Sequence, residues 1–235
     1  MGPRIESFIV AVDGPAGTGK SSATRRLADT LGLIHVDTGA LYRCIAYQCA
    51  EQGLHSDFTE GAVPQIIGIA RDAKLEFKRN PRKNPSNRVF ANGKDITESI
   101  RTPEMSMMAS RVSAIPEVRS ALLDLQRNLG RSAPSILEGR DIGTVIFPDA
   151  QVKFFLTASI DERAKRRLAE LEASGADTPS FEEIREQIRV RDQGDSTRAT
   201  APLRKAEDAI ELNTSNLTLD EVVAKMASII QKVME

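Results

Sequence analysis

Gly14-Pro15-Ala16-Gly17-Thr18-Gly19-Lys20-Ser21 decides the fold of this chain, because it reads G-x-x-x-x-G-K-[ST], the pattern of a phosphate-binding P-loop. Glycines let the backbone bend tightly and bring its N–H groups close to phosphate oxygens. Lys20 adds a mobile positive charge for β- and γ-phosphates, and the Ser21 hydroxyl is a candidate Mg²⁺ ligand. The stretch therefore predicts a site for the phosphates of a nucleotide.

The residues on both sides of this loop are the ones that a P-loop needs. Phe8 to Val12 is a short apolar, β-branched run that predicts a buried strand. Ser22 to Leu31 carries its apolar residues on one helical face, and Gly32 suits the helix end. The loop thus joins a strand to a helix whose N-terminus faces the phosphates. These flanks argue against the alternative, a glycine-rich turn with a chance lysine.

The composition is that of an ordinary globular domain. The chain has 235 residues, 40% of them hydrophobic and 28% charged, with a net charge of −1. This balance gives no electrostatic reason to expect nucleic-acid or membrane binding. Cys44 and Cys49 form neither a metal pattern nor a disulfide framework, and two histidines are too few for a His-rich metal site. With no signal peptide and no apolar run near the ~18 residues of a membrane span, we expect a soluble cytoplasmic protein.

Short apolar runs alternate with helical patterns along the chain. After the first strand, the predicted strands are Leu33–Val36, Ser135–Leu137, Val152–Leu156 and Ala209–Leu212. This alternation predicts an α/β fold, a doubly wound parallel sheet of about five strands with helices on both faces.

The sequence pattern changes between about residues 70 and 100, where it predicts a small β-rich insert. Asn92-Gly93 is a strong hairpin signal. The preceding loop is basic, with Lys78, Arg79, Arg82 and Lys83. Nucleic-acid binding would be one interpretation of these charges, but no aromatic residue lies among them, so a solvated loop is favoured.

Two polar segments are candidates for chemistry. Glu138-Gly139-Arg140-Asp141 follows a predicted strand, where ligands bind in doubly wound sheets, and Glu138 occupies the place of a strand-end acid near Mg²⁺. The alternative is a polar loop with a local Arg–Asp pair. Arg191, Asp195 and Arg198 would align on one helical face, either as an exposed salt-bridged stripe or as a lid whose arginines neutralise a transferring phosphate.

Over most of its length the chain resembles the bacterial cytidylate (CMP/dCMP) kinases. The most specific segments are Asp37-Thr38-Gly39-Ala40-Leu41-Tyr42-Arg43 and Glu138-Gly139-Arg140-Asp141-Ile142-Gly143-Thr144. Further matching stretches are Asp13–Ser22, Ile100–Glu104, Ala109–Ser113, Arg191–Arg198 and Ala201–Leu203. Thr38 stands where the family commonly has Ser, and Ser21-Ser22 where it often has Gly-Thr; each keeps a hydroxyl.

The resemblance implies an enzyme that transfers the γ-phosphoryl group of ATP to CMP or dCMP, with Mg²⁺ accompanying ATP. The implied ATP-binding residues are Gly14, Pro15, Ala16, Gly17, Thr18, Gly19, Lys20, Ser21 and Ser22. The implied CMP-binding residues are Thr38, Arg43, Ser110, Arg119, Arg140, Asp141, Arg191 and Asp195. The implied catalytic residues are Lys20, Arg140, Arg191 and Arg198.

For the CMP-binding residues together with the catalytic Arg198, the resemblance implies three groups of contacts. Thr38, Arg43, Arg140 and Arg198 would face the acceptor phosphate and the transferred group. Ser110, Arg119 and Asp141 would recognise cytosine, and Arg191 with Asp195 would contact the sugar.

The resemblance also implies one P-loop kinase domain with two appendages. The core would comprise residues 1–69, 101–161 and 186–235, the nucleotide-monophosphate-binding insert about 70–100, and a mobile lid about 162–185. We expect a monomer whose partners are ATP and CMP or dCMP, with no nucleic acid and no membrane.

Two other functions stay open. A kinase for UMP, AMP or shikimate would share the P-loop, although Ser110, Arg119 and Asp141 argue for cytosine. A P-loop switch or ATP-driven binding module would also share it. The chain, however, has neither an Asn-Lys-x-Asp guanine motif nor a Leu-Ser-Gly-Gly-Gln signature.

Overall fold

The computed structural model describes residues 8–55, 58–79, 87–173, 175 and 178–235. The chain forms two compact units: unit 1 comprises Met1–Asp37 and Arg127–Glu235, and unit 2 comprises Thr38–Gln126. The P-loop lies in unit 1.

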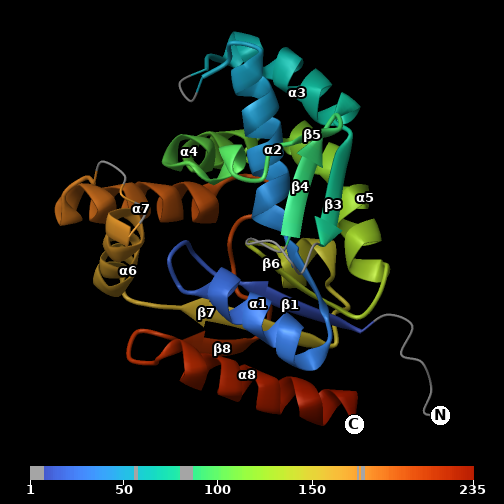
Figure 1. The fold of residues 1–235 in the computed structure, drawn as a ribbon, viewed down its shortest axis with the longest axis vertical. Coiled ribbons are helices and arrows are strands. Elements are labelled where there is room, and N and C mark those ends of the chain that lie inside the picture. Colours follow the sequence, from blue (N-terminus) through green and yellow to red (C-terminus); the bar gives the residue numbers. More distant parts are fainter. Residues whose placement is uncertain (1–7, 56–57, 80–86, 174, 176–177) are drawn as a thin grey trace. The chain divides into compact units, whose positions relative to one another are not determined.

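Unit 1 is built on a parallel sheet of five strands among its described residues, in the order β2-β6-β1-β7-β8 (Figure 1). The strands are β1 (Ile9–Asp13), β2 (Ile34–Asp37), β6 (Ser135–Gly139), β7 (Val152–Thr157) and β8 (Ile210–Asn213). The helical segments are α1 (Lys20–Leu31), η3 (Ile142–Ile146), α6 (Ile160–Ala173), α7 (Phe181–Thr197) and α8 (Leu219–Met234). The predicted α/β fold with about five parallel strands is confirmed.

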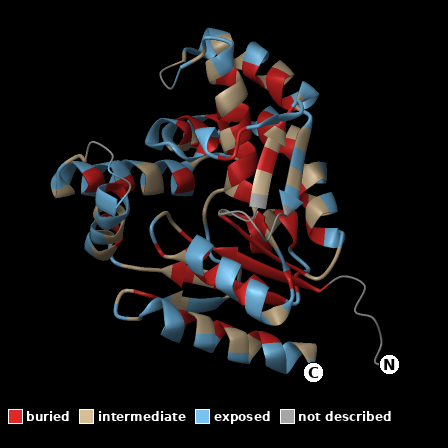
Figure 2. Cartoon of the chain, viewed as in Figure 1, coloured by how far each residue is buried: buried red, intermediate tan, exposed pale blue. Residues whose placement is uncertain are grey.

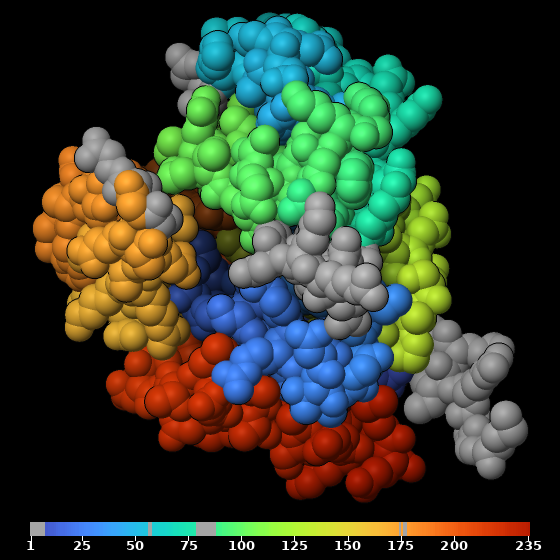
Figure 3. All heavy atoms as spheres, viewed as in Figure 1, coloured from blue at the N-terminus to red at the C-terminus, as the bar shows by residue number. Residues whose placement is uncertain are grey.

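Alternate residues of the strands show how each face of the sheet is covered. Val10 and Val12 of β1 pack with α1 and α8 in one apolar cluster, and these two helices lie side by side on that face (Figures 1 and 3). Asp13 and Leu137 belong to the opposite face, where η3 and the last turn of α5 (Pro116–Arg131) lie. Helices therefore cover both faces, and the central strands are buried along their whole length (Figure 2).

Local sequence signals account for the helix ends in unit 1. Gly32 ends α1 with a φ of 69°, in the left-handed region that glycine adopts without strain. Ser180 and Glu183 form a complete capping box before α7, and Thr218 and Glu221 form another before α8. Gly194 does not interrupt α7, which continues to Thr197. Arg191 and Asp195 therefore lie on one continuous helix, and Arg198 directly follows its last residue.

Unit 2 combines helices with a small antiparallel sheet in the order β3-β4-β5. Its elements are α2 (Thr38–Glu51), η1 (Glu60–Ala62), α3 (Val63–Asp72), β3 (Leu75–Arg79), β4 (Asn87–Ala91), β5 (Lys94–Asp95), η2 (Ser99–Arg101), α4 (Pro103–Val112) and the start of α5. Asn92 and Gly93 join β4 to β5 with φ angles of 51° and 79°, which confirms the predicted hairpin.

The core of unit 2 joins this sheet to α2. Val89 and Ala91 of β4 pack with Ala40 and Cys44 of α2, and Phe77 covers the cluster. The side chains of Cys44 and Cys49 are both buried in this unit.

The predicted insert (about 70–100) falls on β3, β4, β5 and the segment after them, and the predicted lid (about 162–185) on α6 and the start of α7. Their roles stay predictions. Most of the basic loop, including Arg82 and Lys83, lies outside the described residues. None of the described helices is long and apolar enough to cross a bilayer.

Candidate active site

The P-loop of unit 1 is shaped by three glycines with positive φ. Gly14, Gly17 and Gly19 have φ angles of 144°, 77° and 85°, which L side chains rarely adopt. A Cβ on Gly14 would lie 2.1 Å from the carbonyl oxygen of Leu156 in β7. The loop thus needs glycine here both for its backbone angle and for its close approach to the sheet.

Lys20 is the buried cation of the loop. Its Nζ donates to the carbonyl oxygen of Pro15 at 2.6 Å. Burial, together with the positive charge of Arg140, lowers the pKa of Lys20 well below its ordinary value, and the Glu138 carboxylate opposes this shift only in part. Burial is thus the main cause of the shift, and phosphate groups placed beside Lys20 would favour its ammonium form.

Ser21 is held by the carboxylate of Glu138 at the end of β6. Its hydroxyl donates to Oε2 of Glu138 at 2.6 Å. The other oxygen, Oε1, lies 2.9 Å from Nε2 of His35 and accepts from the Thr24 hydroxyl at 3.3 Å. Residues from β6, α1 and β2 thus fix Ser21 in one orientation, and His35 is a packed partner of Glu138.

These residues fit a Mg²⁺ ion that accompanies a nucleotide. Within the described residues no group of three or more His, Cys, Asp or Glu side chains is arranged to hold a metal ion. Mg²⁺ bound with a nucleotide keeps several waters and takes only one or two protein ligands besides phosphate oxygens. The Ser21 hydroxyl would be such a ligand, with Glu138 orienting it.

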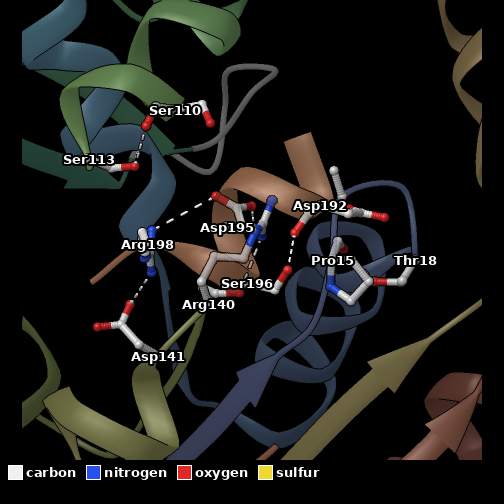
Figure 4. Close-up of polar contacts among 12 residues, drawn as sticks. Pro15, Thr18, Ser110, Ser113, Arg140, Asp141, Asp192, Asp195, Ser196 and Arg198 are labelled. Atoms are coloured by element: carbon white, nitrogen blue, oxygen red, sulfur yellow. Dashed lines mark hydrogen bonds and ion pairs between the residues drawn. The ribbon is translucent and has the colours of Figure 1, made fainter. Parts of the chain in front are cut away.

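A network of arginines and carboxylates joins the end of β6 to α7 (Figure 4). Nε of Arg140 donates to Oδ2 of Asp195 at 2.8 Å. Nη1 and Nη2 of Arg198 lie 3.8 Å from Asp195 and 3.6 Å from Asp141, so Arg198 bridges the two carboxylates. The structure therefore brings together four residues predicted for the site from two distant parts of the sequence.

Asp195 is the acidic centre of this network. Burial alone would raise its pKa, but the charges of Arg140, Arg191 and Arg198 outweigh burial and lower the pKa of Asp195 below its ordinary value. Asp195 and the Arg198 side chain are both buried, with 4% and 6% exposed. The alternative of an exposed salt-bridged stripe is therefore wrong for these two residues.

Two basic residues of α6 were not predicted for the site, yet they contact the P-loop region. The buried Arg163 donates from Nη1 to the carbonyl oxygen of Ala16 at 3.1 Å and pairs through Nη2 with Asp192 of α7 at 2.6 Å. Arg166 donates to the carbonyl oxygen of Thr214 at 2.6 Å, and the Thr214 hydroxyl donates to the Thr18 carbonyl at 3.0 Å. The only signal of these contacts in the sequence was that both arginines belong to an Arg-rich helix.

Asp13, the last residue of β1, is another site residue that sequence reasoning missed. Its two carboxylate oxygens accept from the backbone N–H groups of Ile142 and Gly143, each at 2.8 Å. Burial raises the pKa of Asp13 to about 6, because it outweighs these two hydrogen bonds. Its position at the carboxyl end of a central strand was the signal that could have pointed to it.

The raised pKa of Asp13 makes a prediction about stability and pH. The native carboxyl binds a proton more readily than the unfolded one, whose pKa is near 3.8, so the native state loses stability as pH rises from about 4 to about 6. Compared with Asp13→Asn, the wild type should lose ~3 kcal/mol of unfolding free energy over that window, at ~1.4 kcal/mol per pKa unit. Urea unfolding of both proteins from about pH 4 to about pH 7 measures this, and a constant difference would contradict it.

The other four residues predicted for CMP lie in unit 2. Thr38 is the buried first residue of α2, and the half-buried Arg43 lies in its second turn. Ser113 donates to the carbonyl oxygen of Ser110 at 2.8 Å, and Nη1 of Arg119 donates to the carbonyl oxygen of Ser113 at 3.3 Å. Ser110 and Arg119 thus each contact Ser113, in the turn between α4 and α5.

The ring of Tyr42 completes the surroundings of Arg119. The buried Arg119 guanidinium lies 5.4 Å from the centroid of this ring, within cation–π distance. The contact restrains the side chain on a second side, so Arg119 is held by α2 as well as by the α4–α5 turn.

Comparison with known proteins gives a consistent result. Residues 10–232 match the family model described as cytidylate kinase. The chain is 46% identical to a cytidylate kinase of Geobacter sulfurreducens, over 96% of this chain and 93% of that protein, and 45% identical to one of Syntrophotalea carbinolica, over 95% and 92%. An uncharacterized protein from Eubacterium ventriosum, 12% identical, has the same fold with a TM-score of 0.51 over 96% of this chain and 99% of its own.

Proposed function

Because the chain belongs to the cytidylate kinase family, we propose that it transfers the γ-phosphoryl group of ATP to the phosphate of CMP or dCMP, giving ADP and CDP or dCDP. It is thus a transferase of the nucleoside monophosphate kinase class. The observation that carries this proposal is the family match over residues 10–232. Hydrogen bonds and ion pairs hold the P-loop lysine, Arg140 and Arg198 within one unit of this chain.

ATP would bind at the P-loop. The N–H groups of the loop and of the start of α1 would surround the phosphates, with Lys20 as the mobile positive charge. Mg²⁺, held by ATP and the Ser21 hydroxyl, would neutralise charge on the phosphates when bound. The position of Lys20 supports this assignment, because the side chain is buried in the loop with its Nζ 2.6 Å from the Pro15 carbonyl oxygen.

Phosphoryl transfer to the acceptor phosphate requires several arginines near the two reacting groups. Two highly charged anions must approach each other for transfer, and guanidinium groups offset their repulsion and stabilise the charge of the transferring group. Arg140, Arg191 and Arg198, whose charges surround Asp195, would serve this role, and we propose Thr38 and Arg43 as further contacts of the acceptor phosphate. The attacking atom is already a phosphate oxygen, so no general base is required.

The base would be recognised by donors and acceptors that match cytosine. A carboxylate or hydroxyl such as that of Asp141 or Ser110 can accept from the exocyclic amino group, whereas the Arg119 guanidinium can donate to N3 and O2. Uracil reverses the pattern at two of these edges and would leave buried partners unpaired. The mismatch would cost on the order of a few kcal/mol.

Base selectivity provides a specific test of Asp141. We expect Asp141→Ala to reduce the ratio of kcat/KM for CMP over UMP by about tenfold or more, because one buried polar contact to the base is lost. Steady-state kinetics with each acceptor at saturating ATP measure the ratio. Asp149→Ala, which removes an exposed carboxylate from the same unit, is the matched control. An unchanged ratio in Asp141→Ala would remove this residue from base recognition.

A coupled ADP-release assay tests the function as a whole. ATP and Mg²⁺ would be supplied with CMP, dCMP, UMP, AMP or GMP at matched concentrations. Rapid turnover with CMP and dCMP alone is the expected result. Preference for another nucleotide would keep the P-loop assignment but overturn the base-recognising residues. No turnover with any acceptor would overturn the kinase assignment and favour the P-loop switch or binding module.

A further inference from the structure

Asp13 stands outside the residues assigned to substrates, yet it joins the two segments that carry them in unit 1. It immediately precedes Gly14, the first residue of the P-loop. Its carboxylate accepts hydrogen bonds from the backbone N–H groups of Ile142 and Gly143, which directly follow Arg140 and Asp141. One side chain thus ties the start of the ATP-binding loop to the segment proposed to contact the acceptor.

The contact of the Asp13 carboxylate with Ile142 and Gly143 fixes the position of the segment that carries them. Each oxygen of the carboxylate accepts one N–H group at 2.8 Å, so the pair of bonds fixes both the distance and the orientation of the segment. Asp13 is buried, and a buried carboxylate is costly unless such bonds compensate it. A hydrophobic residue would cover the sheet here at no such cost, so packing alone does not account for an aspartate.

The surroundings of Gly143 leave little freedom for the segment. A Cβ at Gly143 would lie 3.1 Å from Cδ of Lys153 and 3.5 Å from Oδ2 of Asp13. Lys153 cannot easily withdraw, because its Nζ is bonded to the carbonyl oxygen of Pro148 at 2.6 Å and to the carboxylate of Asp208 at 2.7 Å. Gly143 is therefore held between the Lys153 stem and the Asp13 carboxylate.

Beyond this contact the segment carries the arginine–carboxylate network. Arg140 reaches Asp195, and Asp141 lies beside Arg198 (Figure 4). A shift of the segment would move both residues relative to the P-loop. A displacement of about 1 Å in a positioning group can cost about 10²-fold in rate.

We propose that Asp13 is a positioning residue, which sets the Arg140–Asp141 segment relative to the P-loop and thereby supports both phosphoryl transfer and cytosine selectivity. This inference rests on the proposed function. Asp13 acts through the backbone of Ile142 and Gly143 and not through a contact with substrate.

Asp13→Asn tests the proposal, because it keeps the size of the side chain but turns an N–H donor toward one of the two N–H groups. We expect kcat with CMP to fall about 10- to 100-fold. We also expect the ratio of kcat/KM for CMP over UMP to fall, because Asp141 is displaced. The Kd of Mg²⁺–ATP, measured by calorimetry in the absence of acceptor, should change by less than about threefold, since the P-loop glycines and Lys20 remain.

The selectivity ratio separates positioning from a merely structural role. A variant that only lost folded protein would turn over CMP and UMP less by the same factor, leaving the ratio unchanged. Asp220→Asn, the same chemical change at an exposed residue of α8 in the same unit, is the matched control and should resemble the wild type.

Gly143→Ala disturbs the same contact at the partner segment and keeps the Asp13 carboxylate. It is the second test of the proposal, for use if Asp13→Asn does not fold. It should also reduce the CMP-over-UMP ratio. An unchanged ratio in the folded variants would overturn the proposal, provided that the wild type phosphorylates CMP. A wild type without CMP kinase activity would instead overturn the proposed function, so the two failures are distinguishable.

Discussion

Replacing Lys20 with alanine should reduce kcat with ATP and CMP by about 10²–10³-fold, the loss typical of removing one preorganised charge from a transition-state site. Lys20 is buried in the P-loop, and its Nζ is oriented by the Pro15 carbonyl. Removing the ammonium removes the charge that we propose for the β- and γ-phosphates. Steady-state kinetics at saturating ATP and CMP measure the loss.

The fold should survive this change. Burial already disfavours the charged form of Lys20, so its removal also relieves a desolvation cost. We expect the thermal midpoint of Lys20→Ala to stay within about 5 °C of the wild type. Lys232→Ala, at an exposed position of α8, is the matched control with unchanged kinetics. Wild-type turnover in Lys20→Ala would contradict the P-loop assignment.

Arg140→Ala should be the most damaging change in the arginine network, with a loss of about 10³-fold or more in kcat, as for arginines that stabilise a transferring phosphoryl group. The change removes a guanidinium from the proposed acceptor site and also the hydrogen bond from Nε to Asp195. Asp195 would then keep Arg198 and the charge of Arg191 as its partners. Single-turnover kinetics would show whether the chemical step itself is slowed.

A conservative change distinguishes charge from geometry at this position. Arg140→Lys keeps the positive charge but lacks the planar fork of donors, so it should recover less than about a tenth of wild-type kcat. Arg189→Ala, which removes an exposed arginine of α7 that contacts Glu186 and Gln193 of the same helix, should leave kcat unchanged. Near-wild-type kcat in Arg140→Ala would show that Arg140 is not part of the transfer site.

Much of the fold could be predicted because its signals are local. The P-loop pattern and the Asn92-Gly93 hairpin each involve residues within a few positions of one another, and both form as predicted. The capping boxes at Ser180 and Thr218 are equally local. Gly194 is a local signal against a helix, yet α7 continues through it, because glycine costs a helix only about 1 kcal/mol.

The site could be predicted only in part. Strand ends and one helical face pointed to Arg140, Asp141, Asp195 and Arg198, and the structure brings these four together. The partners of Asp13 lie about 130 positions away in sequence, and those of Arg163 lie in the P-loop and in α7. No periodicity reveals such contacts, because they depend on how strands order in the sheet and where helices pack.

The most direct test of the central claim is to follow the transferred phosphoryl group itself. The enzyme would be incubated with ATP labelled with ³²P at the γ-position, Mg²⁺ and CMP, and the products would be separated by chromatography. We expect the label to appear in CDP, in an amount equal to the ADP formed, and to depend on CMP. Label released as inorganic phosphate at the same rate with and without CMP would contradict the account, because the protein would then hydrolyse ATP and not phosphorylate a nucleotide.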